Sequence, residues 1–274
     1  MLDSPRRTLA RALAHPLTRG LHLDDPQTTA RRRQIIREKP FLNRLYRDWY
    51  AAVDGALPPV NGAVVELGSG AGFLADCVPE VITTEVFPCA GVRVVADGCA
   101  LPFANGALRA IVMTDVFHHL PDPARFLNDA ARCVRPGGRM VMIEPWVTKW
   151  SRFVYGRFHH EPFEPEAAEW TLQRTGPLSG ANGALPWMVF ARDRERFARD
   201  HREWRIHSIT IQMPLLYLLS GGVSLRSLSP GWSYGIWRAV ERLLAPQMNR
   251  LGMFARIVIE RVSDRDDGDF SARD

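Results

Sequence analysis

The residues of this sequence best suited to chemistry form a glycine-rich turn with an acidic residue in front of it. Gly68, Gly70 and Gly72 recur at every second position, and Glu66 stands two residues before the first of them. Without a Cβ, glycine adopts backbone angles that other residues avoid and lets a ligand approach the main chain. The apolar run before the turn and the residues 73–78 after it predict a strand, a turn and a helix. That unit opens a doubly wound α/β sheet.

The spacing of the turn argues against a dinucleotide fingerprint. Such a fingerprint has a third small residue, because helix and strand pack closely there, and this chain has Phe73 at that position. A dehydrogenase is therefore disfavoured. The alternative is that the glycine turn binds no ligand and only closes a strand.

Acidic residues also stand where four further strands should end. The strands are predicted over 81–85, 92–97, 110–114 and 139–144, and the acids are Glu85, Asp97, Asp115 and Glu144. In open α/β sheets, ligands lie beyond the carboxyl ends of the strands. Glu85 is 17 residues past Gly68. An acid at about this distance accepts hydrogen bonds from the ribose hydroxyls of a bound nucleoside.

The remaining elements follow from apolar spacing and turn residues. Helices are predicted from Thr28 or Thr29 to Arg37 and over 40–57, 124–134 and 188–201, and strands over 205–214 and 253–262. The expected domains are an N-terminal arm with helices (1–59), a main domain (60–262) and an acidic, disordered tail (263–274). The main domain carries insertions at about 146–188 and 215–252.

Together, the motifs resemble those of a known enzyme family. ELGSGAG (66–72), the acid at 85, ADGCALPF (96–103), TDVFHHL (114–120) and RPGGRMVMIEP (135–145) are similar in order and spacing to the class I S-adenosylmethionine-dependent methyltransferases. In particular, they resemble the broad group related to ubiquinone and menaquinone biosynthesis methyltransferases, over about residues 60–146. It implies a seven-stranded, mostly parallel, Rossmann-like sheet with an antiparallel last strand. The cofactor would be S-adenosyl-L-methionine, with S-adenosyl-L-homocysteine as product.

The resemblance also implies how the methionine end of the cofactor would be held. Four residues of the turn would wrap it: Gly68, Ser69, Gly70 and Gly72. Glu66 would face its ammonium group, and Thr114 or Asp115 would lie beside this end.

For the nucleoside end, the resemblance implies that Glu85 holds the ribose and that Asp97, with the backbone of Gly98, contacts the adenine edge. Each strand-end acid could instead be a cap or a surface charge. Glu144 could equally pair with an arginine.

Two histidine pairs are the candidates for a catalytic base, since methyl transfer needs alignment and often a proton acceptor. His118 and His119 follow the fourth strand, and His159 and His160 lie in the first insertion. The alternative for the first pair is a helix start with one ring in the interior. His159, His160 and Glu161 could also ligate a metal, but no further ligand stands at a suitable spacing, so we expect no metal site.

The insertions are the candidates for an acceptor pocket. They hold the aromatic residues Trp146, Trp150, Phe153, Tyr155, Phe158, Phe163, Trp170, Trp187, Tyr217, Trp232, Tyr234 and Trp237. These could line an apolar pocket, face a membrane, or form the ordinary core of a cap. We expect a small-molecule or lipid-like acceptor, with O-methylation as the first hypothesis. The oligomeric state stays open.

Composition separates the remaining alternatives. Residues 1–50 hold ten Arg and one Lys against five acids, which suits a solvated helix face or an arm for nucleic acid or membrane. A nucleic-acid methyltransferase is unlikely, because no Asn-Pro-Pro-Tyr-like sequence follows the fourth strand. A non-catalytic nucleoside-binding module of the same fold remains an alternative. The four cysteines are dispersed along the sequence, so we expect reduced thiols. We find neither a secretory signal nor an apolar spanning segment, so we expect a cytoplasmic protein.

Overall fold

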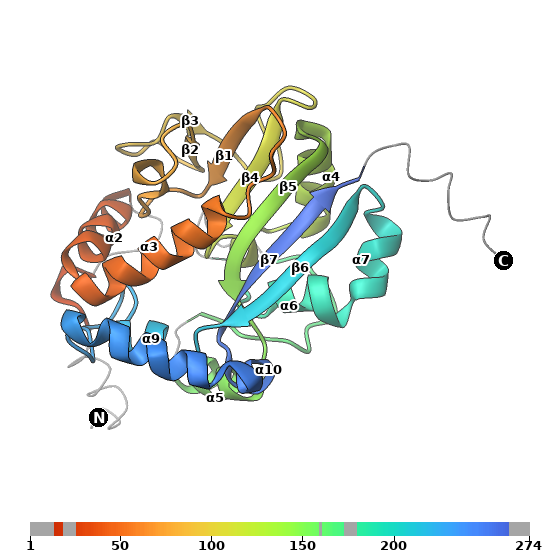
Figure 1. Ribbon diagram of the computed structural model, residues 1–274. Helices are drawn as coiled ribbons and strands as arrows, with labels where there is room; N and C mark the ends of the chain where they lie inside the picture. Colours follow the sequence, from red (N-terminus) through yellow and green to blue (C-terminus); the bar gives the residue numbers. More distant parts are fainter. Residues whose placement is uncertain (1–13, 19–25, 159–160, 173–179, 263–274) are drawn as a thin grey trace, which may run out of the picture.

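The chain is built on a seven-stranded sheet. The computed structural model describes residues 14–18, 26–158, 161–172 and 180–262. The strands are β1 Ala63–Leu67, β2 Ile82–Glu85, β3 Val94–Val95, β4 Leu108–Thr114, β5 Val134–Pro145, β6 Trp204–Gln212 and β7 Phe254–Arg261. Their order is β3-β2-β1-β4-β5-β7-β6, with β7 antiparallel to β5 and β6 and the pairs among β1–β5 parallel (Figure 1). The predicted α/β fold with an antiparallel last strand is confirmed.

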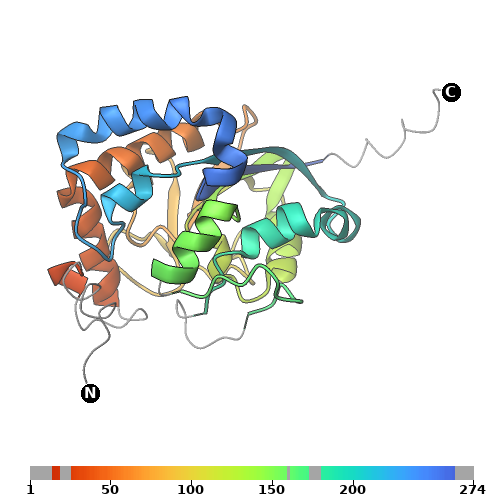
Figure 2. The same cartoon turned by 90° about the horizontal axis from the view of Figure 1, so that it is seen from below.

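Helices cover both faces of the sheet, as Figure 2 shows edge-on. They are α2 Pro26–Glu38, α3 Pro40–Asp54, α4 Pro123–Cys133, α5 Lys149–Phe158, α6 Leu185–Trp187, α7 Arg194–Asp200, α8 Leu216–Ser220, α9 Tyr234–Leu243 and α10 Met248–Leu251. Short 3-10 turns are η1 Pro16–Thr18, η2 Leu74–Asp76, η3 Phe117–His119, η5 Gly231–Ser233 and η6 Ala245–Gln247, and η4 Met188–Arg192 is a π-helical turn. Helices α3 and α9 lie on one face, and α4 and α7 lie on the other.

The hydrophobic core has one part on each face of the sheet. Successive residues of a strand belong to different parts, because their side chains point to opposite faces. Val64 belongs to the cluster that contains Trp49 of α3. Its neighbour Val65 belongs to the cluster that contains Phe126 of α4. Both faces of β1 are therefore buried, and its carboxyl end is left as the place where a ligand can approach.

Three predicted elements differ from the structure. The helix expected over 73–78 is only the turn η2, because Pro79 follows and disfavours a helical residue before it. The helix expected over 188–201 is divided into η4 and α7 at Asp193, whose side chain is bound by Trp170 and Arg192. The strand expected over 92–97 is only β3.

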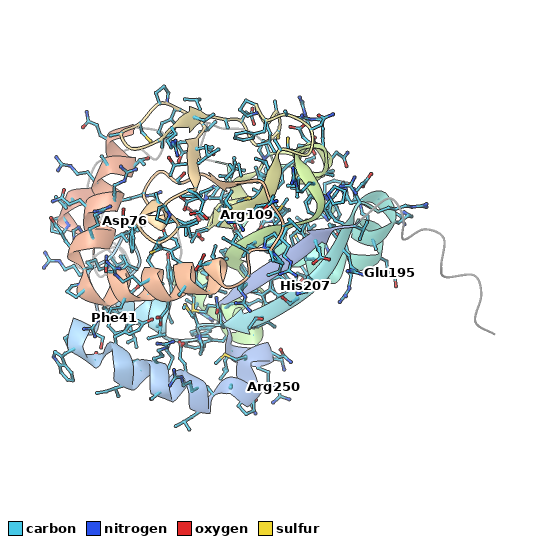
Figure 3. All side chains as sticks on the ribbon, turned by 45° about the horizontal axis from the view of Figure 1, so that its top comes forward. Phe41, Asp76, Arg109, Glu195, His207 and Arg250 are labelled. Atoms are coloured by element: carbon cyan, nitrogen blue, oxygen red, sulfur yellow. The ribbon has the colours of Figure 1, made fainter. Side chains whose placement is uncertain are left out.

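The segment between β6 and β7 packs on α3. Tyr234 of α9 donates a hydrogen bond to Asp48 (2.7 Å), and its ring meets the edge of Phe41, labelled in Figure 3. The buried Lys39 ammonium donates to the carbonyls of Gly222 (2.6 Å) and Leu225 (2.8 Å). These contacts hold the loop after α8 against the start of α3, beside the carboxyl edge of the sheet.

The structure also bears on the cysteines and on membrane-spanning segments. The four cysteines are free thiols. No helix within the described ranges is both long and apolar enough to cross a bilayer.

Candidate functional site

The glycine turn after β1 is fastened to β2 and to α2. Ser69 donates its backbone N–H to the Thr84 carbonyl (2.8 Å), and the Ser69 hydroxyl accepts the Thr84 N–H (2.8 Å). From α2, the Arg33 guanidinium donates to the Gly70 carbonyl through Nε (3.1 Å) and Nη2 (2.5 Å). Gly68 has φ +67°, a left-handed conformation that glycine adopts without strain. The turn is therefore held rigidly before any ligand arrives.

A cavity of about 440 Å³ opens at this turn, at the carboxyl edge of β1, β2 and β4. Nine of the ten predicted cofactor residues line it: Glu66, Gly68, Ser69, Gly72, Glu85, Asp97, Gly98, Thr114 and Asp115. Gly70 does not line the cavity. A Cβ at Gly70 would lie 2.5 Å from Glu85 Oε2 and 2.7 Å from Thr29 Cγ2, so a larger residue here would displace these two side chains. Nine of the predicted residues, from four segments of the chain, thus lie around one cavity.

Glu66 is the most unusual group of the cavity. Its side chain is 3% exposed, and Oε2 has no hydrogen-bond partner within the described part of the chain. Burial raises the pKa of Glu66 to about 8. An unpaired, buried carboxylate oxygen is costly unless a ligand completes it, and a cationic group is the natural partner. The site therefore fits a ligand with an ammonium group next to the glycine turn.

Glu85 and Asp97 stand on the other side of the turn, at the ends of β2 and β3. Glu85 accepts the N–H of Gly70 (3.2 Å) and of Val86 (2.9 Å), which fixes its carboxylate beside the loop. Burial raises the pKa of Glu85. Asp97 accepts the Cys99 N–H (2.9 Å), which closes a tight turn. Both carboxylates are therefore fixed in orientation beside the cavity.

Asp115, at the end of β4, has a strained backbone. Its φ of 62° is rare for a residue with a side chain, and its N–H donates to the Ile143 carbonyl of β5 (2.8 Å). Burial raises the pKa of Asp115 to about 6. Strained residues of this kind concentrate at functional sites, and Asp115 lines the cavity.

The adjacent histidines have opposite environments. His118 is 1% exposed and does not line the cavity; its Nδ1 lies 2.8 Å from Glu144 Oε2 and its Nε2 lies 3.6 Å from Glu161 Oε2. Burial opposes the charged form, but the bonds to Glu144 and Glu161 raise the pKa of His118 well above its usual range. His118 is thus the interior ring, and it cannot touch an acceptor in the cavity.

His119 lines the cavity and is the candidate that the acceptor could meet. Its Nδ1 lies 3.1 Å from the Gly180 carbonyl, which only accepts, so Nδ1 carries the proton and Nε2 the lone pair. Burial first, and then the neighbouring His118, lower the pKa of His119 to about 3. His119 is therefore neutral and weakly basic near pH 7. The predicted candidates His159 and His160 lie outside the described residues.

A second, smaller cavity continues from the first. It shares Asp115 and Glu161 with it, and it is lined by aromatic residues of the insertions and β7: Tyr155, Phe163, Tyr217 and Phe254. Other insertion aromatics lie elsewhere: Trp150 donates to the Pro214 carbonyl, and Trp232 is 75% exposed. The insertions therefore give the site an apolar end with only a few of their aromatic side chains.

Several lining residues were not found from the sequence. Thr29 and Arg32 come from α2, and Tyr46 and Tyr50 come from α3. The Tyr50 hydroxyl accepts the N–H of Phe73 (3.2 Å), directly after the glycine turn. No motif marks these positions. Only the packing of both helices across the carboxyl edge brings them to the cavity.

A protein-family model described as "Methyltransferase domain" matches residues 65–142, from β1 to within β5. This stretch contains the strand-end acids Glu66, Glu85, Asp97 and Asp115, and it ends two residues before Glu144. Residues 65–142 are thus similar to the methyltransferase domain family. The agreement covers the glycine turn, the strand-end acids and the His118–His119 pair.

Curated proteins that are similar in sequence to this chain are named as methyltransferases. An uncharacterized methyltransferase of Mycobacterium leprae (strain TN) is 31% identical over 132 residues, which is 38% of this chain and 49% of that protein. One from Mycobacterium sp. (strain JLS) is 32% identical over 108 residues, 34% of this chain and 42% of that protein. The chain thus spans about half the length of the first relatives it matches.

Solved structures are similar at lower identity. A geranyl diphosphate C-methyltransferase from Streptomyces coelicolor has 16% identity and a TM-score of 0.48, covering 96% of this chain and 100% of that chain. An S-adenosylmethionine-dependent methyltransferase from Mesorhizobium loti has 14% identity and a TM-score of 0.44, covering 77% of this chain and 96% of that one. No conclusion about the acceptor follows from similarities at this level.

Proposed function

We propose that this protein transfers a methyl group from S-adenosylmethionine to a small, partly apolar acceptor. The observation that carries the proposal is Oε2 of Glu66, which is buried and has no hydrogen-bond partner among the described residues, in a cavity beside a rigid glycine turn. A carboxylate there fits the ammonium group of an amino-acid ligand. The similarity of residues 65–142 to the methyltransferase domain family supports the same conclusion.

The residues of the cavity divide by what they would hold. Glu66 and the glycine turn would bind the methionine end, Glu85 the ribose hydroxyls, and Asp97 with Gly98 the adenine edge. Bound there, S-adenosylmethionine supplies an activated methyl carbon on a sulfonium. The protein then contributes alignment, since in-line displacement depends on the position of the two reacting groups.

The acceptor end lies beyond Asp115, where the small aromatic cavity begins. Of the groups there, Asp115 suits proton acceptance better than His119, because a pKa of about 6 leaves it ionised and basic near neutral pH. We therefore assign the base role to Asp115 instead of the histidines that the sequence favoured. His118 acts through Glu144 as a positioning residue: Glu144 accepts the N–H groups of Val116 and Phe117, just after Asp115.

An acceptor hydroxyl is the chemistry that we favour, because it carries the proton that a carboxylate base removes. The second cavity, of about 10 Å³, has room for no more than about one water molecule, so only its aromatic walls, beside Asp115 and Glu161, support an apolar group on the acceptor. The narrower similarity to quinone-biosynthesis methyltransferases stays a prediction.

The test is release of S-adenosylhomocysteine from S-adenosylmethionine in the presence of apolar extracts, with mass spectrometry of the methylated product. Asp115→Asn should lower kcat by about 100-fold or more while cofactor affinity changes little. Asp76→Asn is the control, since Asp76 is exposed and paired with Arg37 away from the cavity (Figure 3). Cofactor binding without turnover in any acceptor pool would instead favour the non-catalytic binding module.

A further inference from the structure

Three possible metal ligands meet at the acceptor end of the cavity. His118, His119 and Glu161 each offer one ligand atom, and these atoms lie within 4.8 Å of one another. His118 and His119 follow β4, whereas Glu161 lies in the insertion after α5. We propose that these three side chains bind a divalent transition-metal ion, with zinc as the favoured metal.

The outer partner of His118 orients its ring for metal binding. Glu144 is fully buried, and its Oε1 accepts the N–H groups of Val116 (2.9 Å) and Phe117 (2.7 Å). Its Oε2 lies 2.8 Å from His118 Nδ1. Nδ1 is therefore the donor, and Nε2 is the atom left for a ligand. A carboxylate on the far nitrogen of a histidine is the usual outer partner of a metal-ligating ring.

His119 is oriented in the same way by a backbone group. Its Nδ1 donates to the Gly180 carbonyl (3.1 Å), so its Nε2 carries a lone pair. The two imidazole rings lie with centroids 4.1 Å apart. Both histidines therefore have their outer nitrogens satisfied and their Nε2 atoms left for coordination, which is the arrangement that second-shell partners produce at metal sites.

The distance between His118 and Glu161 would also accommodate an ion between them. Nε2 and Oε2 are 3.6 Å apart. A charge-assisted N–H···O bond would bring these atoms to about 2.8 Å. Two ligands at 2.0–2.2 Å from one tetrahedral ion lie roughly 3.3–3.5 Å apart, close to the observed separation.

The site would be open toward the cavity, because His119 and Glu161 both line it. Two imidazoles and one carboxylate suit borderline ions such as zinc or cobalt(II), and three protein ligands leave a coordination position for a further group. If the protein is a methyltransferase as proposed above, that group would be an oxygen of the acceptor, which the ion would orient and make more acidic. The ion would also give buried His118 its contact with the cavity.

The test is metal binding by the tag-free full-length chain after chelator treatment. Zinc stoichiometry is measured by calorimetry and elemental analysis, and cobalt(II) coordination by its visible absorption. The wild type should bind one equivalent, and His119→Ala and Glu161→Gln should each weaken binding by at least about 100-fold, beyond the usual effect of losing an outer partner. His207→Ala is the matched control: His207, on β6 in Figure 3, also lies 3.6 Å from a carboxylate, that of Glu260, but away from the cavity.

Failure of the metal proposal can be distinguished from failure of the methyltransferase proposal. S-adenosylmethionine binding is measured on the same samples. Cofactor binding without stoichiometric metal, or equal metal affinity in wild type and the His119 and Glu161 variants, would overturn the metal site and leave the methyltransferase proposal standing. Stoichiometric metal binding without cofactor binding would overturn the methyltransferase proposal and leave the metal site standing.

Discussion

Glu66 is the side chain whose replacement by glutamine should stabilise the ligand-free protein while weakening its binding of S-adenosylmethionine. Burial raises the pKa of Glu66 from 4.5 to about 8. Between these values the carboxyl is ionised in the unfolded chain and neutral in the folded one, so folding takes up a proton. Stability contributed by this group therefore falls as pH rises from 4.5 to about 8 and is level above that.

The magnitude follows from the pKa values. At pH 7, protonating Glu66 costs about 3 kcal/mol, from 1.36 kcal/mol for each pH unit between 4.5 and 7. Glutamine has no such cost. Glu66→Gln should thus raise the free energy of unfolding by up to about 3 kcal/mol at pH 7, which corresponds to about 6–12 °C in Tm.

Cofactor binding should change in the opposite direction. The ammonium group requires an ionised Glu66, and the ionised fraction rises from about 1% at pH 6 to about 50% at pH 8. Wild-type affinity should therefore increase by roughly 50-fold over this range, up to the pH at which the ligand's amine itself loses its proton. Glu66→Gln should remove this pH dependence and weaken binding at pH 8 by about 10- to 100-fold, the cost of losing a charged hydrogen bond.

The assays are thermal denaturation of the ligand-free protein and calorimetric titration with the cofactor at pH 6, 7 and 8. Glu80→Gln is the control, since Glu80 is an exposed carboxylate paired with Arg109 (3.0 Å) and should change neither result. A lower Tm in Glu66→Gln, or an unchanged cofactor affinity, would refute the reasoning.

Three further predictions concern the loop and its supports. Gly70→Arg should abolish cofactor binding with a native circular dichroism spectrum, because its side chain would displace the Glu85 carboxylate; retained affinity would contradict this. Arg33→Ala should lower cofactor affinity by about tenfold through loss of the bonds to the Gly70 carbonyl, with a Tm loss worth about 1 kcal/mol. His118→Ala should cost about 3–5 kcal/mol in urea unfolding by leaving Glu144 buried without its partner, and adding Glu144→Gln should recover part of that loss.

Local sequence patterns predicted the parts of the site that lie at strand ends. Glu66, Glu85, Asp97 and Asp115 could be placed at one edge because parallel strands share the direction of their carboxyl ends. Their positions depended only on recognising β1, β2, β3 and β4, which are short strands rich in β-branched residues. The shortness of β3 did not matter, since Asp97 still follows it.

The parts that were missed depend on long-range packing. Arg33 reaches the Gly70 carbonyl from α2, and Glu161 reaches His118 from the insertion after α5. Neither pair has a fixed spacing that a motif could encode. The helix predicted after the glycine turn was wrong because Pro79 outweighed the apolar pattern. The histidines were also treated alike, although burial beside Glu144 separates His118 from His119.

The most direct test of the central claim is calorimetric titration of the purified protein with S-adenosylmethionine and S-adenosylhomocysteine. We expect one site with micromolar affinity for both ligands. Absence of binding to either, in a protein with native circular dichroism, would contradict it and leave the glycine turn as a structural feature only.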